Sequence, residues 1–408
     1  MKKFFKRFCV ICFSFSVVIF GFISYYNNIL PSNIVIYDNE SVHFNTKLKI
    51  SEVNNEKINS VSNAKQTASR NYNTNLSVMG VIPVKSVNIK VVNRRYVALS
   101  GENFGIKIFT KGVMVVGMSD VITNTKSVNP AKESGLKLGD IILKINGKDV
   151  NSNSELSSII NKSLGKSVAL KVKRENKILN LSLVPVLSSD DNIYKAGLWV
   201  RDSTAGLGTM TFYSPVDGSF AGLGHGIVDV DTGELLPINS GEIVKTEILS
   251  ITKSKVGTAG EICGAFTGLH QGKLTYNCEC GLYGYLDDFD TSKKVTLVSH
   301  KQDVKTGKAK ILTTITNGKP KYYDCVIEKV DYNNDEQKNL QIRITDKELL
   351  EKCGGIVQGM SGSPIIQDGC LVGALTNVFV NSPEKGYAVF AETMLETAKN
   401  LEQFKEAG

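Results

Sequence analysis

A serine in a glycine-flanked turn is the residue of this 408-residue chain best suited to covalent chemistry. Ser361 lies in the run Gly359-Met360-Ser361-Gly362-Ser363-Pro364, which leads into an apolar stretch and an Asp368-Gly369 hairpin turn. Such a turn exposes the hydroxyl and can aim backbone amides at one point, as the oxyanion of an acyl-transfer reaction requires. An isolated Gly-x-Ser-Gly run usually marks only a tight turn into a strand, but the Ser-Pro pair and the hairpin make this run more specific.

A serine nucleophile needs a general base, and the chain offers only four histidines. His43 lies in a polar linker, while His270 and His300 lie in polar or turn-like surroundings. His225 ends a short apolar stretch and has glycines on both sides, which gives its ring space beside another backbone. A histidine considered alone is more often structural, but beside a reactive serine in one β-rich domain His225 is the predicted base.

The elements that must position these two residues are short strands. After Val186, apolar stretches alternate with Gly, Asp-Gly and Asn-Gly turns, and one amphipathic helix is expected near residues 391–404. Regular short strands with turn signals indicate a barrel or sandwich. We therefore predict a mainly β chain whose residues 187–408 form the catalytic domain.

A second motif lies upstream, in the run from Asn129 to Lys148 (NPAKESGLKLGDIILKINGK). Pro130 can open a short helix, Gly135 can end it, and Asn146-Gly147 predicts a hairpin turn. This order resembles the bacterial PDZ domain, which we place at residues 96–186. The resemblance implies that an extended peptide binds as an added strand, in a groove that starts near Phe104, Gly105 and Ile106. The alternative is that the domain only packs against its neighbour.

The N-terminus reads as a membrane anchor. Lys2, Lys3, Lys6 and Arg7 precede an uncharged apolar run from Phe8 to Tyr26, close to the length that spans a bilayer. A cleaved signal peptide is the alternative, but the first alanine is Ala64, so no Ala-x-Ala site follows the run. We expect an anchor at 1–27 with the N-terminus cytoplasmic, a stalk at 28–95, and the remaining chain outside the cytoplasm.

Together, the His225 and Ser361 motifs, the PDZ-like run and the N-terminal segment closely resemble the stage IV sporulation protein B family of serine peptidases. The resemblance implies a chymotrypsin-like double β-barrel, with Ser361 as nucleophile and His225 as base. It also implies that Asp346 orients the imidazole, as in a Ser-His-Asp triad. By analogy with chymotrypsin-like enzymes, the amides of Gly359 and Ser361 form the oxyanion hole.

Two departures from the chymotrypsin pattern matter. Met360 stands where those enzymes carry an aspartate that pairs with a new N-terminus, so activation by that ion pair is excluded. Asp346 precedes Ser361 by only fifteen residues, which makes it the least secure member of the triad. Asp229 and Asp231 are possible substitutes, although a turn-capping role suits both.

Composition excludes several other classes. The net charge is +8, but four of these charges precede the apolar run, and no basic stripe is interleaved with aromatics, so we expect no nucleic-acid partner. The Cys278-Glu-Cys280 spacing is not a zinc signature, and the cysteines outside the anchor are expected to be buried or partly oxidised thiols. No metal or organic cofactor is expected.

The family resemblance implies cleavage of a membrane-bound sporulation regulator, and of the enzyme's own N-terminal region, in the space between the two membranes around the developing spore. Such cleavage would permit activation of a late mother-cell transcription factor. Two alternatives remain, a PDZ adaptor whose peptidase domain is inactive and a general quality-control protease.

Overall fold

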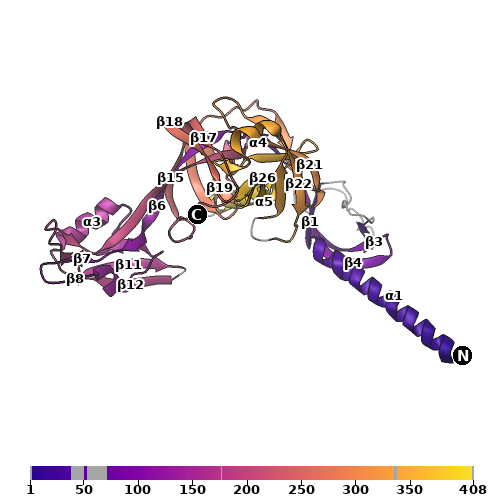
Figure 1. The fold of residues 1–408 in the computed structure, drawn as a ribbon, viewed down its shortest axis with the longest axis horizontal. Coiled ribbons are helices and arrows are strands. Elements are labelled where there is room, and N and C mark those ends of the chain that lie inside the picture. Colours follow the sequence, from indigo (N-terminus) through magenta and orange to yellow (C-terminus); the bar gives the residue numbers. More distant parts are fainter. Residues whose placement is uncertain (1, 38–49, 53–70, 176, 335–337, 407–408) are drawn as a thin grey trace.

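A computed structural model describes residues 2–37, 50–52, 71–175, 177–334 and 338–406. Figure 1 shows three regions, with the N-terminal helix and a small sheet at one end, a β-rich body in the middle and a second β domain at the other end. The chain is mainly β, as predicted.

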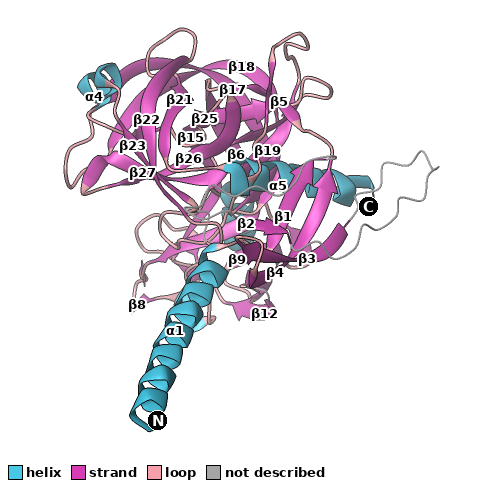
Figure 2. Cartoon of the chain, turned by 90° about the vertical axis from the view of Figure 1, so that its right-hand side faces the viewer, coloured by secondary structure: helices cyan, strands magenta, loops and turns pink. Residues whose placement is uncertain are grey.

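The described residues of the N-terminal region form one helix and a four-stranded sheet with strand order β1-β4-β3-β2. Figure 2 shows the helix projecting away from the strand-rich body. Tyr26, Leu30, Ile34 and Ile89 are buried in a shared core, so the described part of the expected stalk is a packed sheet. The elements are α1 (Lys2–Ile29), β1 (Asn33–Tyr37), β2 (Ile50–Glu52), β3 (Asn71–Val78) and β4 (Ile82–Val92).

The predicted membrane anchor is not confirmed. Over the part of the chain that the structure describes, no helix combines the length and the apolar character that crossing a bilayer requires. Residues 38–49 and 53–70 of the expected stalk lie outside the described residues.

The second β domain has the local structure expected of the PDZ-like run. Asn129 caps α2 by accepting a hydrogen bond from the amide of Lys132, and Pro130 is its first residue. The Asn146-Gly147 turn joins β9 to β10, with both residues at positive φ. The elements are β7 (Val121–Ile122), β8 (Ser127–Val128), α2 (Pro130–Glu133), β9 (Ile141–Ile145), β10 (Lys148–Asp149), α3 (Asn153–Lys162), β11 (Val168–Arg174), β12 (Lys177–Leu183), β13 (Val186–Leu187) and β14 (Tyr194–Lys195).

The central body begins with a closed six-stranded barrel. β6 pairs with β17 along one edge and with β15 along the other, which closes the ring β6-β17-β18-β19-β16-β15. Its strands are β6 (Asn103–Met118), β15 (Leu198–Tyr213), β16 (Ser219–Gly222), β17 (Ile238–Thr252), β18 (Gly260–Cys278) and β19 (Gly281–Leu286). β5 (Tyr96–Leu99), β20 (Val295–Leu297) and β24 (Val357–Gln358) extend the same sheet.

A second barrel closes with the order β21-β22-β23-β27-β26-β25, so the expectation of two barrels is confirmed. Its interior is an aliphatic core that includes Ile311, Ile342 and Leu375. Its elements are β21 (Gly307–Thr313), β22 (Lys321–Val330), β23 (Leu340–Ile344), α4 (Lys347–Cys353), β25 (Pro364–Gln367), β26 (Cys370–Phe379), β27 (Ser382–Phe390) and α5 (Ala391–Glu406), with the short helix η1 (Lys301–Asp303) before them.

Two long strands run through both the PDZ domain and the first barrel. Residues 113–114 of β6 pair with β9 of the PDZ domain, whereas residues 103–110 pair with barrel strands. The N-terminal end of β15 also pairs with residues 114–118. Residues 96–99 and 103–110, within the range expected for the PDZ domain, therefore pair with strands of the barrel sheet, and the N-terminal end of β15 packs against the PDZ core through Leu198 and Val200.

Candidate active site

The Ser361 turn lies where the two barrels meet. Gly359 and Gly362 have φ values of +97° and +94°, which favour glycine. A Cβ on Gly362 would lie 1.9 Å from the carbonyl oxygen of Thr209, so only glycine fits. Thr209, in β15 of the first barrel, donates its amide to the carbonyl of Ser361 at 2.9 Å, and Thr211 donates its hydroxyl to the carbonyl of Gly362 at 2.7 Å. β15 thereby holds the turn that precedes β25 of the second barrel.

The His225 segment follows β16 and lies against the same strand. The amide of Leu223 donates to the carbonyl of Thr209 at 3.2 Å. A Cβ on Gly362 would lie 2.5 Å from the Leu223 nitrogen, and one on Gly224 would lie 3.1 Å from the methyl group of Thr376. The structure therefore brings the two predicted motifs side by side, with Thr209 between them.

The imidazole of His225 is half-buried, and a main-chain group orients it. Its Nδ1 lies 2.9 Å from the carbonyl oxygen of Gly226. A carbonyl only accepts hydrogen bonds, so Nδ1 carries the proton and Nε2 keeps a lone pair. Burial lowers the pKa of His225 below its usual value, an effect that the Gly226 carbonyl partly offsets. The ring is therefore neutral at neutral pH, the form that a general base needs.

The Ser361 hydroxyl donates to the carbonyl oxygen of Thr376 at 2.6 Å. Among the hydrogen bonds of the described residues, none joins this hydroxyl to the His225 ring. The predicted nucleophile and base are thus neighbours in the fold, but their catalytic hydrogen bond is not formed. A rotation of the Ser361 side chain away from Thr376 is required before proton transfer.

The predicted oxyanion hole consists of the amides of Gly359 and Ser361. Within the described ranges, neither amide donates to a protein acceptor, whereas the neighbouring Gly362 amide donates to the carbonyl of Leu375 at 2.7 Å. Two free amides on one turn are the donors that an acyl-transfer oxyanion requires.

Asp346 is occupied elsewhere. It is the N-cap of α4, and its carboxylate accepts from the amides of Leu349 at 3.1 Å and Asp324 at 3.3 Å. In the part of the chain described, no hydrogen bond or ion pair joins Asp346 to His225. The structure therefore does not bring the expected third member of the triad to the other two, because the start of α4 uses its carboxylate.

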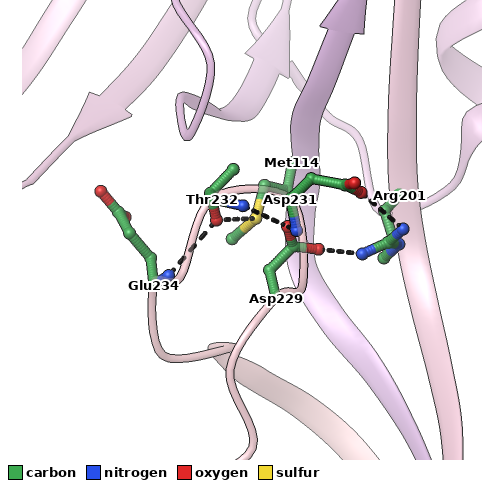
Figure 3. A network of polar contacts seen from close by, with 6 residues as sticks. All are labelled: Met114, Arg201, Asp229, Asp231, Thr232 and Glu234. Carbon is green, nitrogen blue, oxygen red and sulfur yellow. Dashed lines mark hydrogen bonds and ion pairs between the residues drawn. The ribbon is translucent and has the colours of Figure 1, made fainter. Parts of the chain in front are cut away.

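Asp229 and Asp231 do not replace it. Figure 3 shows that the carboxylates of Asp229 and Asp231 both form ion pairs with the Arg201 guanidinium, and the Asp231 carboxylate lies 2.8 Å from it. The buried Asp229 also accepts from the amides of Asp231 and Thr232, each at 3.0 Å. The turn-capping role suggested for Asp229 is confirmed, and its carboxylate fixes the loop that follows His225.

The expected start of the PDZ groove is not what the structure shows. Phe104 and Ile106 are buried in the core of the first barrel, and a Cβ on Gly105 would lie 2.7 Å from the Phe266 ring. β6 pairs with β15 at all three positions, and it also pairs with β17 on its other side at Gly105 and Ile106. Since an added strand needs an unpaired edge, these three residues cannot bind a peptide in this way.

Sequence reasoning missed the groups that hold the site together. Thr209 and the Asn277 side chain bind the backbone of the two motifs, whereas the carbonyls of Gly226 and Thr376 accept hydrogen bonds from the His225 ring and the Ser361 hydroxyl. The Asn277 amide group accepts from the amide of Ile227 at 2.8 Å and donates to the carbonyls of Ile227 and Leu236. No sequence signal marks a backbone acceptor, although the glycines on both sides of His225 and Ser361 did indicate close approach of other chain segments.

Comparison with known families identifies both domains. The family model described as SpoIVB peptidase S55 matches residues 192–395, and the PDZ domain model matches residues 85–184. The first match covers half of the chain and contains His225, Asp346 and Ser361.

Curated relatives match shorter parts. A probable periplasmic serine endoprotease DegP-like from Brucella suis is 30% identical over 153 residues, or 36% of this chain and 29% of that protein. Serine protease HTRA1 from Xenopus tropicalis is 41% identical over 76 residues, and the regulator of sigma-W protease RasP from Bacillus subtilis is 39% identical over 62 residues. These matches cover 19% and 15% of this chain, and 15% of each relative.

Among solved structures, the PDZ domain of the SdrC-like protein from Listeria monocytogenes is 22% identical and covers 22% of this chain and 90% of its own, with a TM-score of 0.19.

Proposed function

This chain belongs to the SpoIVB peptidase S55 family of serine peptidases, and we propose that it is an endopeptidase that uses Ser361 as nucleophile and His225 as general base. The observation that carries the proposal is the contact between the two motifs. Leu223 and Gly362 meet backbone to backbone, on either side of Thr209, in a domain of two closed barrels.

The proposed reaction begins with rotation of the Ser361 hydroxyl from the Thr376 carbonyl toward Nε2 of His225. Nε2 takes the hydroxyl proton as the oxygen attacks the scissile carbonyl. The amides of Gly359 and Ser361 then bind the oxyanion. His225 returns the proton to the leaving amine, and water hydrolyses the acyl-enzyme by the same steps.

A main-chain carbonyl would replace the carboxylate of the usual triad. Gly226 accepts the Nδ1 proton at 2.9 Å and so fixes the tautomer that leaves Nε2 free. A neutral carbonyl stabilises the imidazolium less than a carboxylate does, so we expect catalysis slower than that of a full Ser-His-Asp enzyme.

The biological role is part of the proposal. Family membership supports cleavage of a membrane-bound regulator during sporulation and activation of a late mother-cell sigma factor, and the PDZ domain supports recognition of a peptide segment. The basic cluster ahead of the apolar N-terminal run supports membrane attachment, with the catalytic domain outside the cytoplasm. Self-cleavage in the N-terminal region is proposed on the same family basis.

A fluorophosphonate probe tests the chemistry directly. We expect the full chain to be labelled at Ser361 and to produce shortened forms of itself, while Ser361→Ala does neither and His225→Ala is labelled far more slowly. Ser363→Ala is the matched control, because the Ser363 hydroxyl is buried two residues away and donates to the Met360 carbonyl. A folded wild-type chain that is not labelled would contradict the proposal and favour a PDZ adaptor.

A further inference from the structure

Two cysteines face each other across a tight turn of the first barrel. Cys278 is the last residue of β18, Cys280 directly precedes β19, and Cys278 pairs in register with Gly281. The two sulfur atoms lie 3.3 Å apart. Both thiols are free, and their sulfur atoms are already in contact in this structure.

The surroundings of Cys280 favour its thiolate. Its sulfur is buried and lies 3.1 Å from the hydroxyl of Thr397 and 3.3 Å from that of Tyr283. The hydrogen bond from the Cys278 thiol, together with these two hydroxyls, lowers the pKa of Cys280 to about 6. Cys278 is only half-buried, so a small oxidant can reach it.

Cys325, Cys353 and Cys370 lack these features. Burial raises the pKa of Cys325 to about 12 and that of Cys353 to about 11, which keeps both as unreactive thiols. Cys370 is half-buried, and burial raises its pKa as well. The pair at residues 278 and 280 therefore differs from them both in the contact between two sulfurs and in its stabilised thiolate.

The turn that carries the pair packs against the His225 segment. A Cβ on Gly226 would lie 2.7 Å from the Cys278 carbonyl oxygen, and one on Gly281 would lie 2.6 Å from the Gly222 carbonyl oxygen. Asn277, directly before Cys278, makes the three hydrogen bonds that hold Ile227 and Leu236. The backbone that orients the His225 ring through Gly226 is therefore fixed by the same turn.

We propose that Cys278 and Cys280 form a redox-sensitive dithiol, and that its oxidation to a disulfide lowers peptidase activity by displacing the segment that holds His225. The regulatory part rests on the proposed role of His225 as base. The oxidant is a small or protein disulfide, in keeping with a location outside the cytoplasm.

The exchange proceeds in two balanced steps. The Cys280 thiolate takes the proton of the Cys278 thiol as the Cys278 sulfur attacks the oxidant disulfide, which releases one thiolate and leaves a mixed disulfide on Cys278. The released thiolate takes the proton from the Cys280 thiol, and the Cys280 thiolate then attacks the Cys278 sulfur and releases the second thiolate. Cys278 and Cys280 together lose two electrons and two protons, and the oxidant disulfide is reduced to two thiols.

The disulfide cannot form without moving the turn. A disulfide bond is about 2.05 Å long and requires a near-perpendicular torsion about the sulfurs, so the pair must close from its 3.3 Å contact and its backbone must follow. Gly226 has no space to absorb this movement, because the Cys278 carbonyl already lies against it. The hydrogen bond between the ring and the Gly226 carbonyl is then displaced.

Redox titration of the full chain tests the proposal. The chain is equilibrated in mixtures of reduced and oxidised glutathione, the peptide containing residues 278–280 is analysed by mass spectrometry, and the rate of fluorophosphonate labelling is measured on the same samples. We expect this peptide to lose two hydrogens under oxidising conditions while labelling slows about tenfold or more. Dithiothreitol should restore both readouts.

Matched variants separate the dithiol from other thiols. Cys278→Ser and Cys280→Ser should be labelled at the reduced wild-type rate in every mixture, whereas Cys370→Ser should respond as the wild type does. A peptide that stays reduced in all mixtures, or a disulfide that forms without slower labelling, would overturn the proposal.

The outcome is also distinguishable from failure of the proposed function. If the reduced wild type is never labelled at Ser361, the peptidase assignment fails, while the mass readout still reports whether the dithiol forms its disulfide. If a Cys278→Ser chain proves unfolded, Cys280→Ser provides the same test, because each variant removes one of the two sulfurs.

Discussion

At the residue scale, the arrangement around His225 departs from a full triad because the imidazole meets a carbonyl instead of a carboxylate. The two motifs that the fold brings side by side, around Ser361 and His225, could be recognised in the sequence because glycines flank both residues. The orienting Gly226 carbonyl was not predictable, because every residue has a carbonyl and only the fold decides where it points. Asp346 was expected to orient the ring, but its position before a helix gives it a different partner.

The lowered pKa of His225 predicts that activity persists to a lower pH than is usual for a histidine base. Because burial favours the neutral ring, the base stays unprotonated at pH values where an ordinary histidine is already half charged. The rate of fluorophosphonate labelling should therefore fall only as pH drops through a midpoint below the usual value of about 6.5. Ser363→Ala should show the same midpoint, and a midpoint above that of a free histidine would contradict this account.

Asp346 offers a test that separates a helix cap from a triad member. Asparagine is as good an N-cap as aspartate, so Asp346→Asn should keep both stability and labelling rate close to wild type. Asp346→Ala should lower the free energy of unfolding by about 1 kcal/mol, because the Leu349 amide loses its partner. Denaturant unfolding and labelling of both variants check this.

A large loss of labelling rate in Asp346→Asn would instead support a role for Asp346 in the triad. In a Ser-His-Asp triad, replacing the aspartate by asparagine stabilises the wrong imidazole tautomer and lowers the rate by orders of magnitude. A folded Asp346→Asn chain with such a loss would show that Asp346 reaches His225 in the reacting state.

At the element scale, the loop after His225 is held by a buried ion pair. The carboxylate of Asp229 is fully buried on the Arg201 guanidinium, which β15 contributes (Figure 3). Removing the guanidinium leaves that carboxylate without its charged partner in a site of low polarity. Arg201→Met should therefore lower the free energy of unfolding by about 3 kcal/mol and slow labelling of Ser361.

The control for this variant is Lys195→Met, which removes an ion pair with Asp191 in which both side chains are exposed. It should leave unfolding and labelling nearly unchanged. Equal stability of the two variants in thermal unfolding would show that the Arg201 pair does not fix the loop.

The types of the elements were easier to predict from the sequence than their boundaries. Pro130 and Asn146-Gly147 marked a helix start and a hairpin correctly, since these residues act through their own backbone preferences. The course of β6 was not predictable, because this strand continues from the barrel into the PDZ domain without a break in composition. The groove expected at Phe104–Ile106 failed for the same reason.

At the scale of the whole molecule, the PDZ domain and the barrels share strands, so we expect them to unfold together. Arg174 binds the buried carboxylate of Asp140 with two hydrogen bonds of 2.7 Å. Arg174→Met should destabilise the PDZ domain, and the loss should also appear in the peptidase domain, through β6 and β15. The single tryptophan, Trp199, lies at the PDZ end of β15 and reports on that end, while labelling of Ser361 reports on the other.

In Arg174→Met the temperatures at which tryptophan fluorescence and labelling are lost should fall by the same amount. Lys144→Met, which removes an ion pair with the exposed Asp149, is the control. Labelling that survives well above the tryptophan transition would mean that the two domains unfold separately.

The shared strand β15 also has a mechanical consequence. Arg201 and Thr209 are eight residues apart on this one strand, a span of about 26 Å at a rise of about 3.3 Å per residue. An extended strand cannot lengthen further, and no flexible linker separates the two ends of β15. A force that moves the PDZ domain therefore also moves Thr209. A substrate that is bound by the PDZ domain and fixed at its other end would thus apply tension to β15, which lies between Ser361 and His225. The rate of cleavage would then depend on the tension in the substrate.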